Sequence, residues 1–468
     1  MFRSRTHRAI VGLALLALIF AACDEWPTLG FDAARTGFSP GETTLTTDNV
    51  GQLQKLWATS SKLPDTGFDS SPVVADGSVF VAAGNLRVFS ADGTTGCSGT
   101  PLVCKPMWTA VQGGESTPTY ANHVVYTTYG NSLYGFDALG ESGCSGTPKT
   151  CQPLWKAVLG GKPGSPVVSR GVLYVGTDQD APKHDLLYAF DAAGVEGCSS
   201  SPKVCQPLWR STSDAGATPA VAGGLVYAAT TNEAVGGGAI ETLAAFDAAG
   251  TDGCSGTPKR CSPRWLYQAE DACECVMAGP PSIADGRLFV FSTFCCSMQS
   301  ADTDLLTFDA DGHDGCTGTE PRRCQPIRRQ TVDPYFDRTH PPVAEANGLA
   351  FASALGTTVI DASTGVEQWG VGGTVSSPSI AGGLMFVVAG GAAPNPNKVL
   401  ITPRAYDAAG VAGCSGSPKS CAPLWTGEGV KVDSPFGYVN GSWAAPVVAH
   451  GILYTRVGNL RAYRLPPG

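Results

Sequence analysis

Short runs of β-branched and aromatic residues recur along this chain, each preceded by a glycine or a polar turn. Eight such runs begin at Val79, Val124, Val172, Leu225, Arg287, Leu349, Leu384 and Ile452. They read VFVAA, VVYTT, VLYVGT, LVYAAT, RLFVFST, LAFAS, LMFVV and ILYTR. These residue types favour strands, and the glycines and prolines between them indicate tight connections. The pattern predicts an all-β protein made of many short strands.

Three further signals accompany each run in a fixed order. A proline, usually after Ser or Thr, comes before it; a strand ending near an aspartate follows it; a strand begun by a tryptophan comes last. The prolines are Pro72, Pro118, Pro166, Pro219, Pro281, Pro342, Pro378 and Pro446, and the tryptophans are Trp57, Trp108, Trp155, Trp209, Trp265, Trp369 and Trp425. Ile327 is interpreted as taking the tryptophan place once. A four-strand unit repeated eight times predicts an eight-bladed β-propeller of four-stranded antiparallel blades.

The two ends of the chain each supply part of a blade. The first tryptophan strand, at residues 53–58, has no blade before it, and the last strand, at residues 460–464, has no tryptophan strand after it. We expect the N-terminal strand to pair with the C-terminal blade and close the ring. Such closure removes exposed strand edges, which otherwise promote aggregation.

Six near-identical cysteine loops join the third and fourth strands of successive blades. Their pairs are Cys97 with Cys104, Cys144 with Cys151, Cys198 with Cys205, Cys254 with Cys261, Cys316 with Cys324, and Cys414 with Cys421. A tetrahedral metal site needs four ligands in one place, and each loop supplies only two. The loops therefore predict six disulfides, each closing a small ring, and an oxidising compartment.

Four further cysteines break this pattern. They are Cys273, Cys275, Cys295 and Cys296, in two loops of the fifth blade that we expect to emerge on one face. We interpret them as two disulfides, and the sequence leaves all three connectivities open. A copper or zinc site, helped by Met277 or Met298, is the alternative, since soft ligands suit those metals.

The start of the chain has the pattern of a targeting segment. Arg3, Arg5 and Arg8 precede an apolar run at residues 9–22, which is shorter than the ~20 residues that span a bilayer. The run ends in FAAC, which resembles a bacterial lipobox, and an ordinary cleavable signal is the alternative. We therefore predict a signal peptide at 1–22, a lead-in at 23–50 lipidated on Cys23, and a propeller at 51–468.

Composition and motifs limit the chemistry. The net charge is −9, and no Lys/Arg cluster of the kind that binds nucleic acid follows the leader. No later stretch is long and apolar enough to span a membrane. The sequence has no G-x-S-x-G elbow, H-E-x-x-H motif or phosphate loop, so we expect no catalytic residue and no metal. The turn at 309–314 is similar to a calcium loop, but sister turns of equal length lack its second aspartate. Long loops at 177–185, 230–241, 293–304 and 390–398 are the candidates for binding.

Two further segments carry a family resemblance. The turn DASTGVEQW at 361–369 and the lead-in WPTLGFDAARTGFSP at 26–40 resemble the PQQ-like (quinoprotein-type) β-propeller repeat family. That family includes quinone-dependent dehydrogenases, kinases with propeller sensor domains, and a lipid-anchored outer-membrane assembly protein without enzymatic activity. The adjacent Cys295 and Cys296 resemble the vicinal disulfide that lies against the quinone in the alcohol dehydrogenases. Their calcium ligands, catalytic aspartate and haem motif are not recognisable here.

Together these observations predict a membrane-anchored bacterial lipoprotein of the periplasm or cell surface. We expect a binding or scaffold propeller of the cell envelope, whose partner is another envelope protein or a surface ligand, with no cofactor and no nucleic acid. One alternative is a PQQ-dependent dehydrogenase, which would bind PQQ and calcium. The other is a purely structural envelope protein.

Overall fold

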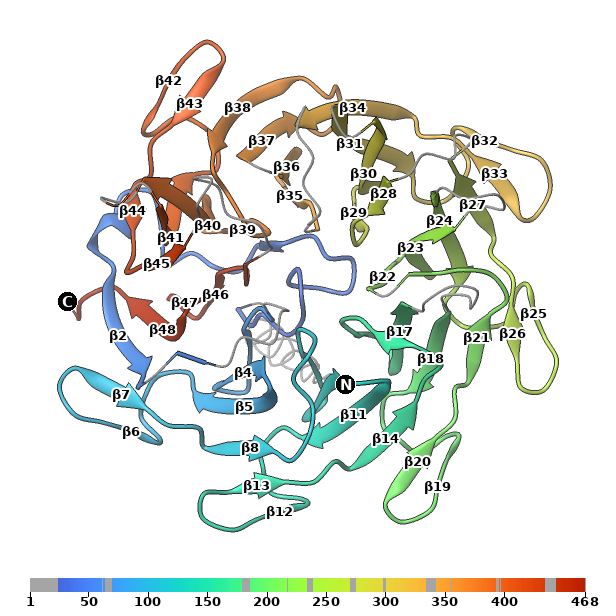
Figure 1. The fold of residues 1–468 in the computed structure, drawn as a ribbon, viewed down its shortest axis with the longest axis horizontal. Helices are drawn as coiled ribbons and strands as arrows, with labels where there is room; N and C mark the ends of the chain where they lie inside the picture. The colour runs from blue at the N-terminus through green and yellow to red at the C-terminus, as the bar shows by residue number, and fades with distance from the viewer. Residues whose placement is uncertain are drawn as a thin grey trace, which may run out of the picture.

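The computed structural model describes residues 24–60, 62–63, 70–178, 186–216, 218–233, 239–269, 275–297, 300–333, 342–354, 356–392, 395, 397–433 and 443–467. Within these residues the strands form eight sheets arranged around a central axis, and the molecule is a β-propeller (Figure 1). We number the sheets one to eight in the order of their innermost strands.

Each sheet is built on four antiparallel strands that follow one another outward from the axis. Sheets one to four are β3 (Val73–Ala75), β4 (Ser78–Ala83), β5 (Asn85–Ser90), β8 (Trp108–Ala110); β9 (Thr119–Ala121), β10 (Val124–Tyr129), β11 (Ser132–Asp137), β14 (Trp155–Val158); β16 (Val167–Ser169), β17 (Val172–Asp178), β18 (Leu187–Asp191), β21 (Trp209–Ser211); and β22 (Ala220–Ala222), β23 (Leu225–Glu233), β24 (Ala239–Asp247), β27 (Trp265–Gln268). Sheets five to eight are β29 (Ser282–Ala284), β30 (Arg287–Ser297), β31 (Ser300–Asp309), β34 (Arg328–Asp333); β35 (Ala344–Ala346), β36 (Leu349–Ser353), β37 (Gly356–Asp361), β38 (Glu367–Gly372); β39 (Ser379–Ala381), β40 (Leu384–Ala392), β41 (Lys398–Asp407), β44 (Trp425–Thr426); and β46 (Val447–Ala449), β47 (Ile452–Val457), β48 (Asn459–Arg464), β2 (Gln54–Thr59).

The eighth sheet combines a strand from the N-terminal part of the chain with the last three strands. Strand β2 lies antiparallel to β48, with Gln54 opposite Arg464 and Ala58 opposite Arg461. The one helical turn among the described residues, η1 (Val50–Gln52), directly precedes β2 in the chain. Strand β2 is thus the outermost strand of a sheet whose three inner strands are the last three of the chain.

At five junctions between sheets, a recurring tryptophan, a tyrosine or both donate to a carbonyl in the turn of the next sheet. Trp265 Nε1 and Tyr227 OH in sheet four both donate to the carbonyl of Ala310 in the turn after β31, each at 3.1 Å. Gly312 in the same turn has φ +69°, and a Cβ there would lie 2.3 Å from Trp265 Cδ1. The glycine is therefore required both for the left-handed backbone and for the close approach of the indole. Sheets eight and one repeat the arrangement, where Trp57 and Tyr454 share the carbonyl of Ala91.

Sheet five departs from this arrangement, and the assignment of Ile327 to the tryptophan place is wrong. Arg328 pairs with Thr307 on β31, as Trp265 pairs with Ala245 on β24. The Arg328 guanidinium donates to the carbonyl of Ala362 at 3.1 Å and so replaces an indole N–H. Ile327 precedes it and is 43% exposed.

The six cysteine loops form disulfides with Cα–Cα distances of 3.9 to 4.0 Å. Each loop is a hairpin that leaves its own sheet and pairs in parallel with the outermost strand of the preceding sheet. The hairpins are β6 (Cys97–Ser98) with β7 (Leu102–Cys104) on β2; β12 (Cys144–Ser145) with β13 (Thr150–Cys151) on β8; β19 (Cys198–Ser199) with β20 (Lys203–Cys205) on β14; β25 (Cys254–Ser255) with β26 (Arg260–Cys261) on β21; β32 (Cys316–Thr317) with β33 (Arg322–Cys324) on β27; and β42 (Cys414–Gly416) with β43 (Lys419–Cys421) on β38. Sequence reasoning predicted only a ring across a turn, whereas each hairpin covers a neighbouring edge.

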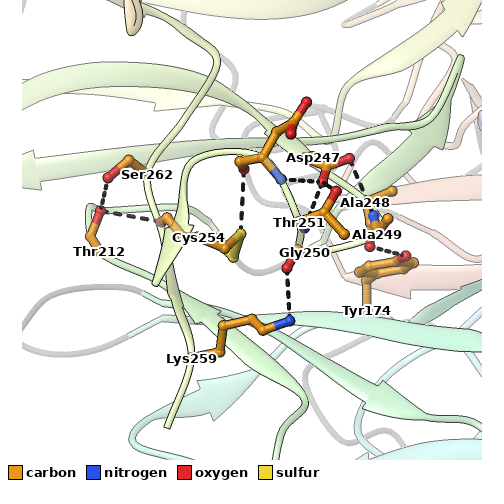
Figure 2. Close-up of a disulfide and its surroundings, with 12 residues drawn as sticks. Tyr174, Thr212, Asp247, Ala248, Ala249, Gly250, Thr251, Cys254, Lys259 and Ser262 are labelled. Carbon is orange, nitrogen blue, oxygen red and sulfur yellow. Dashed lines mark hydrogen bonds between the residues drawn. A yellow bond between two sulfur atoms is a disulfide. The ribbon is translucent and has the colours of Figure 1, made fainter. Parts of the chain in front are cut away.

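A recurring hydrogen-bond pattern holds the turn before five of the six hairpins. In Figure 2, Asp247 Oδ2 accepts the N–H groups of Thr251 and Asp252 at 2.7 and 2.9 Å, and Lys259 Nζ donates to the carbonyl of Gly250. Asp309 accepts the N–H groups four and five residues later in the same way. The calcium-like turn at 309–314 therefore has the backbone geometry of its sisters, which lack the second aspartate.

Candidate functional site

The N-terminal lead-in crosses one face of the ring. Its carbonyls accept N–H groups from the innermost strands of sheets one, two, four, five, six and seven. These bonds run from Val74 to Trp26, Tyr120 to Pro27, Val221 to Ala33, Ile283 to Ala34, Glu345 to Thr36, and Ile380 to Gly37. Strand β1 (Phe38–Ser39) then pairs in parallel with β39. Because all six donors lie just before the first turn of their sheets, the lead-in covers the face that carries those turns.

Arg35 fastens this segment to the ring. Its side chain is fully buried, and it donates to the carbonyls of Pro219, Leu29 and Ser165 at 2.7, 3.0 and 3.3 Å. Burial lowers the pKa of Arg35 to about 9, and the nearby Asp32 carboxylate opposes that shift. Burial likewise raises the pKa of Asp32, whose carboxylate accepts the N–H and hydroxyl of Thr36. Arg35 and Asp32 therefore stabilise the position of the lead-in, and sequence reasoning singled out neither of them.

Glu345 is the second residue that sequence reasoning missed. Its backbone occupies the place of Val74, Val221, Ile283 and Ile380, all apolar, yet it is 5% exposed and carries a carboxyl group. Its Oε2 has no hydrogen-bond partner among the described residues. Burial and then the charge of Asp285 raise its pKa to about 7, against a smaller opposing effect of Arg287. Aligning the repeats on the Ala-Asn-Gly turn that follows would have singled it out.

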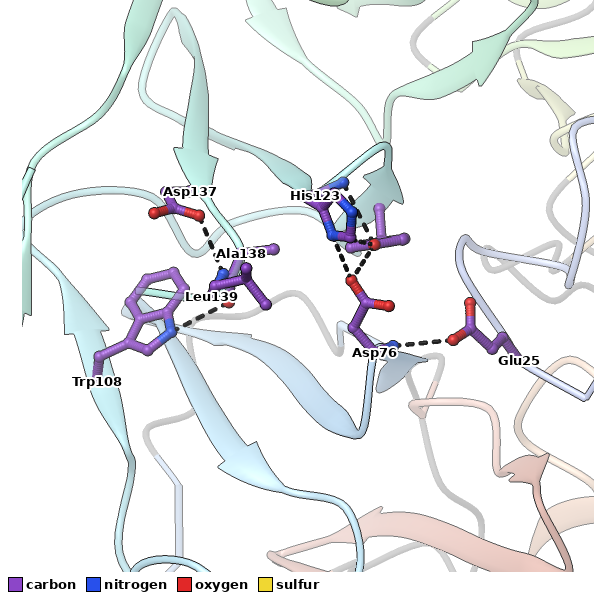
Figure 3. A network of polar contacts seen from close by, with 8 residues as sticks. Glu25, Asp76, Trp108, His123, Asp137, Ala138 and Leu139 are labelled. Atoms are coloured by element: carbon purple, nitrogen blue, oxygen red, sulfur yellow. Dashed lines mark hydrogen bonds and ion pairs between the residues drawn. The ribbon is translucent and has the colours of Figure 1, made fainter. Parts of the chain in front are cut away.

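A polar cluster joins the lead-in to sheets one and two (Figure 3). His123 Nδ1 lies 2.7 Å from Asp76 Oδ2, the hydroxyl of Tyr120 donates to the same oxygen, and the N–H of Asp76 donates to Glu25 at 2.9 Å. Burial, and then the bond to Asp76, raise the pKa of Tyr120. The His123 side chain is 66% exposed. Exposed ion pairs contribute little to stability, so the cluster is best understood as positioning the lead-in.

The opposite face is built from the longest strands. β23, β24, β30, β31, β40 and β41 have 9 to 11 residues. The same strands in sheets one, two, six and eight have 5 or 6 residues. Sheets four, five and seven therefore project beyond the ring. Of the predicted binding loops, residues 179–185, 234–238, 298–299, 393–394 and 396 lie outside the described residues.

Hydroxyl groups link the innermost strands where they begin on this projecting face. The N–H groups of Ala445, Ser71, Thr117 and Ser165 donate in turn to the hydroxyls of Ser71, Thr117, Ser165 and Thr218. Each bond joins one sheet to the next, from sheet eight to sheet four. This explains why Ser or Thr precedes the proline in those repeats. These hydroxyl groups also make the innermost part of the projecting face polar.

The cysteine cluster of sheet five lies at this projecting end. Strand β28 (Cys275–Ala278) pairs antiparallel with β30, and Cys275 is directly opposite Cys295. Two of the four predicted cysteines therefore share a register position, as in the six hairpins. Cys273 lies outside the described residues, and the side chains of Cys275, Cys295 and Cys296 are not described.

Three other predictions bear on the surroundings of the chain. Cys23 and the signal segment at 1–22 lie outside the described residues. Among the residues that are described, no helix is long and apolar enough to cross a membrane. Within the same part of the chain, no three His, Cys, Asp or Glu side chains gather as metal ligands.

Comparison with known proteins gives partial matches. Residues 49–253 match the family model described as outer membrane protein assembly factor BamB. The 1-butanol dehydrogenase (cytochrome c) of Thauera butanivorans is 34% identical over 110 residues, which make up 23% of this chain and 14% of that enzyme. The chain thus matches a small part of the enzyme's length.

Two solved structures are similar over most of the chain. BamB from Moraxella catarrhalis is 12% identical with a TM-score of 0.48, and Sqt1 from Chaetomium thermophilum is 11% identical with a TM-score of 0.48. In both cases the match covers 88% of this chain and 99% of the other. Similarity at this level does not bear on what the chain binds. The chain is a disulfide-bonded β-propeller, and its residues 49–253 are similar to the outer membrane protein assembly factor family.

Proposed function

We propose that this protein is a lipid-anchored, extracytoplasmic β-propeller that binds another envelope protein or a surface ligand. The observation that carries the proposal is the difference between the two faces. One is covered by the lead-in, and the other is extended by the long strands of sheets four, five and seven. Projecting segments on a rigid ring commonly carry binding. The six disulfides and the match to an assembly-factor family support an extracytoplasmic scaffold.

Site-specific photo-crosslinking tests which face binds. A crosslinking residue replaces Asn395 between β40 and β41, and a matched one replaces Val195, which is 70% exposed in a turn of the covered face. We expect a discrete crosslinked envelope protein from position 395 and none from position 195. Crosslinking only from 195 would contradict the assignment of the face. No crosslink from either position would favour a purely structural role.

The anchor is part of the same proposal. Cys23 directly precedes the described lead-in, whose Glu25 and Trp26 lie on the covered face. Multiple acyl chains on Cys23 would hold that face toward the membrane, because two lipid signals give stable attachment. Cys23→Ser should release the protein from membranes in detergent-free fractionation. A mature N-terminus at another residue, found by mass spectrometry, would show that the lipobox interpretation is wrong.

We further propose that the ring has eight blades and closes through the N-terminal strand. The eight sheets and the pairing of β2 with β48 support this. Gln54 and Arg464 are exposed register partners, so Gln54→Cys with Arg464→Cys should form a disulfide without added oxidant. Either single variant is the control. Failure to crosslink in the folded protein would contradict the closure.

A quinone-dependent dehydrogenase is the second candidate, favoured by the 110-residue relative. Among the described residues, no group of three acidic, His or Cys side chains is placed to hold a calcium ion. Incubation with PQQ and calcium, followed by desalting and absorbance spectroscopy, separates the candidates. Under the binding proposal no stoichiometric quinone remains and no alcohol is oxidised.

A further inference from the structure

Covered outer edges are the rule in this propeller. Six of the outermost strands carry a disulfide-bonded hairpin from the following sheet: β2, β8, β14, β21, β27 and β38. β44 carries none, but Val50 and Leu53 from the segment around η1 pack with Trp425 there. Exposed strand edges are templates for pairing with other chains, so this coverage has a physical reason.

Strand β34 is the exception. Among the described strands its only neighbour is β31, and its sheet ends there. The cause is the plain turn after β37: residues 362–366 stand where other repeats have a hairpin. This turn lies against the start of β34: Arg328 donates to the carbonyl of Ala362, and a Cβ on Gly365 would lie 3.1 Å from Gln330 Oε1.

The edge is suited to an added strand. β34 has six residues and contains neither proline nor glycine, the residues that usually interrupt pairing. A register shift falls between Thr303 and Asp304 of β31, so the segment 328–331 pairs regularly. Arg329 and Thr331 are exposed on it. A strand placed here would take the position that β33 takes on β27.

Arginines gather near the start of this edge, although the chain as a whole is acidic. Four arginines lie within residues 322–329. Arg322 and Arg328 are engaged with the carbonyls of Gly312 and Ala362. Arg323 and Arg329 are exposed, and they donate to Gln268 and Tyr267, which are adjacent residues of β27. The two arginines are therefore held against the same strand of sheet four. Arg329 also lies 3.6 Å from Asp304, whose side chain is 10% exposed.

We propose that β34 is a docking edge for an extended acidic segment of the protein partner. The segment pairs with β34 through main-chain hydrogen bonds, and its carboxylates meet Arg323 and Arg329. Strand addition of this kind takes affinity from the backbone and specificity from side chains. The inference rests on the proposed binding function and adds the chemistry of the partner.

A model peptide tests the edge directly. The probe is a fluorescein-labelled, end-capped octapeptide of alternating glutamate and valine, and its lysine–valine analogue is the control. We expect the acidic peptide to bind with a fluorescence anisotropy change that weakens as salt rises, and to slow amide exchange at residues 328–333. Equal binding of both peptides, or no slowing at β34, would overturn the proposal.

Two variants assign the binding to this edge. Arg323→Glu with Arg329→Glu should weaken the binding of the acidic peptide at least tenfold. The control, Lys149→Glu with Arg260→Glu, changes exposed residues of the hairpins that cover β8 and β21, and it should leave the binding unchanged. Inserting the hairpin of residues 248–264 in place of 362–368 should cover β34 and abolish binding while circular dichroism stays native. Retained binding by the grafted protein would overturn the proposal. Dimerisation of the wild type, lost on grafting, would show that the occupant is a second copy.

The outcome is separable from that of the proposed function. A crosslink from position 395 that survives the graft, without peptide binding at β34, would support the proposed binding function and contradict the docking edge. Peptide binding at β34 without a crosslink from position 395 would support the docking edge and contradict the binding role of the projecting face.

Discussion

Glu345 places a carboxyl group where sister sheets have valine or isoleucine. Its pKa in the folded protein, about 7, is raised above the ordinary value of 4.5. Between these two pH values, the folded protein therefore keeps a proton on Glu345 that the unfolded chain has lost. Its contribution to stability is complete below pH 4.5 and is lost as the pH rises through 7.

The first prediction follows from this sign. Glu345→Gln cannot ionise, so the unfolding free energy of the variant relative to the wild type should rise between pH 5 and pH 8, by up to about 3 kcal/mol at the upper end. Urea unfolding at both pH values measures the difference. Glu25→Gln, on the exposed cluster of Figure 3, is the control. A difference that does not change with pH would show that Glu345 is already solvated.

The docked tryptophans give the second prediction. Trp265 is 1% exposed and contacts the turn of the next sheet through Ala310 and Gly312. Trp265→Ala leaves a cavity and removes the donor to that carbonyl, so the unfolding free energy should fall by about 3–5 kcal/mol. Val411→Ala, 71% exposed, should change it by less than about 0.5 kcal/mol. A loss near zero would mean that the sheets are held together elsewhere.

At the scale of elements, the cysteine hairpins hold neighbouring sheets together. The disulfide Cys254–Cys261 lies in the hairpin that pairs with β21, and Cys261 is fully buried. A ring of this length limits the unfolded chain modestly, and the bridge also preserves the geometry in which the hairpin docks.

The third prediction concerns this hairpin. Cys254→Ala with Cys261→Ala should lower the unfolding free energy by up to about 2.5 kcal/mol. Amide exchange should quicken in β21, β25 and β26 and stay unchanged in β4 and β5 of sheet one, because only the neighbouring edge is uncovered. Uniformly faster exchange would contradict a local role, and unchanged exchange would show that pairing survives without the bridge.

At the scale of the whole molecule, the lead-in connects the sheets at one end of the axis. Arg35 joins it to the entries of sheets three and four through the carbonyls of Ser165 and Pro219. Replacing Arg35 by methionine leaves these buried carbonyls without donors, and each such loss costs roughly 1–3 kcal/mol.

The fourth prediction is that Arg35→Met frees the lead-in before the ring unfolds. Limited proteolysis should cut within residues 24–40 in the variant but not in the wild type, while near-UV circular dichroism of the buried tryptophans is retained. Arg170→Met, an arginine in a turn of sheet three, is the control. Loss of the near-UV signal together with cleavage would show that the lead-in and the ring form one cooperative unit.

The sequence by itself determined the strand-rich repeat, the propeller class and the six cysteine pairs. These features are local: strand period, turn glycines and cysteine spacing repeat within one unit, so comparing the copies shows them. The recurring tryptophan position was also visible, although its substitute was misplaced by one residue, because only the register against Thr307 shows that Arg328 takes the position.

Tertiary structure alone decided where each hairpin docks, what the lead-in covers and which edge stays open. A hairpin paired with the preceding sheet, or Arg35 bonded to residues more than a hundred positions away, follows from the closing of the ring and from no spacing along the chain. Burial of Glu345 depends in the same way on the lead-in that crosses β35. Sequence marks the missing hairpin after β37, but only the arrangement of the sheets shows that its absence uncovers β34, because the hairpin covers a neighbour and not its own blade.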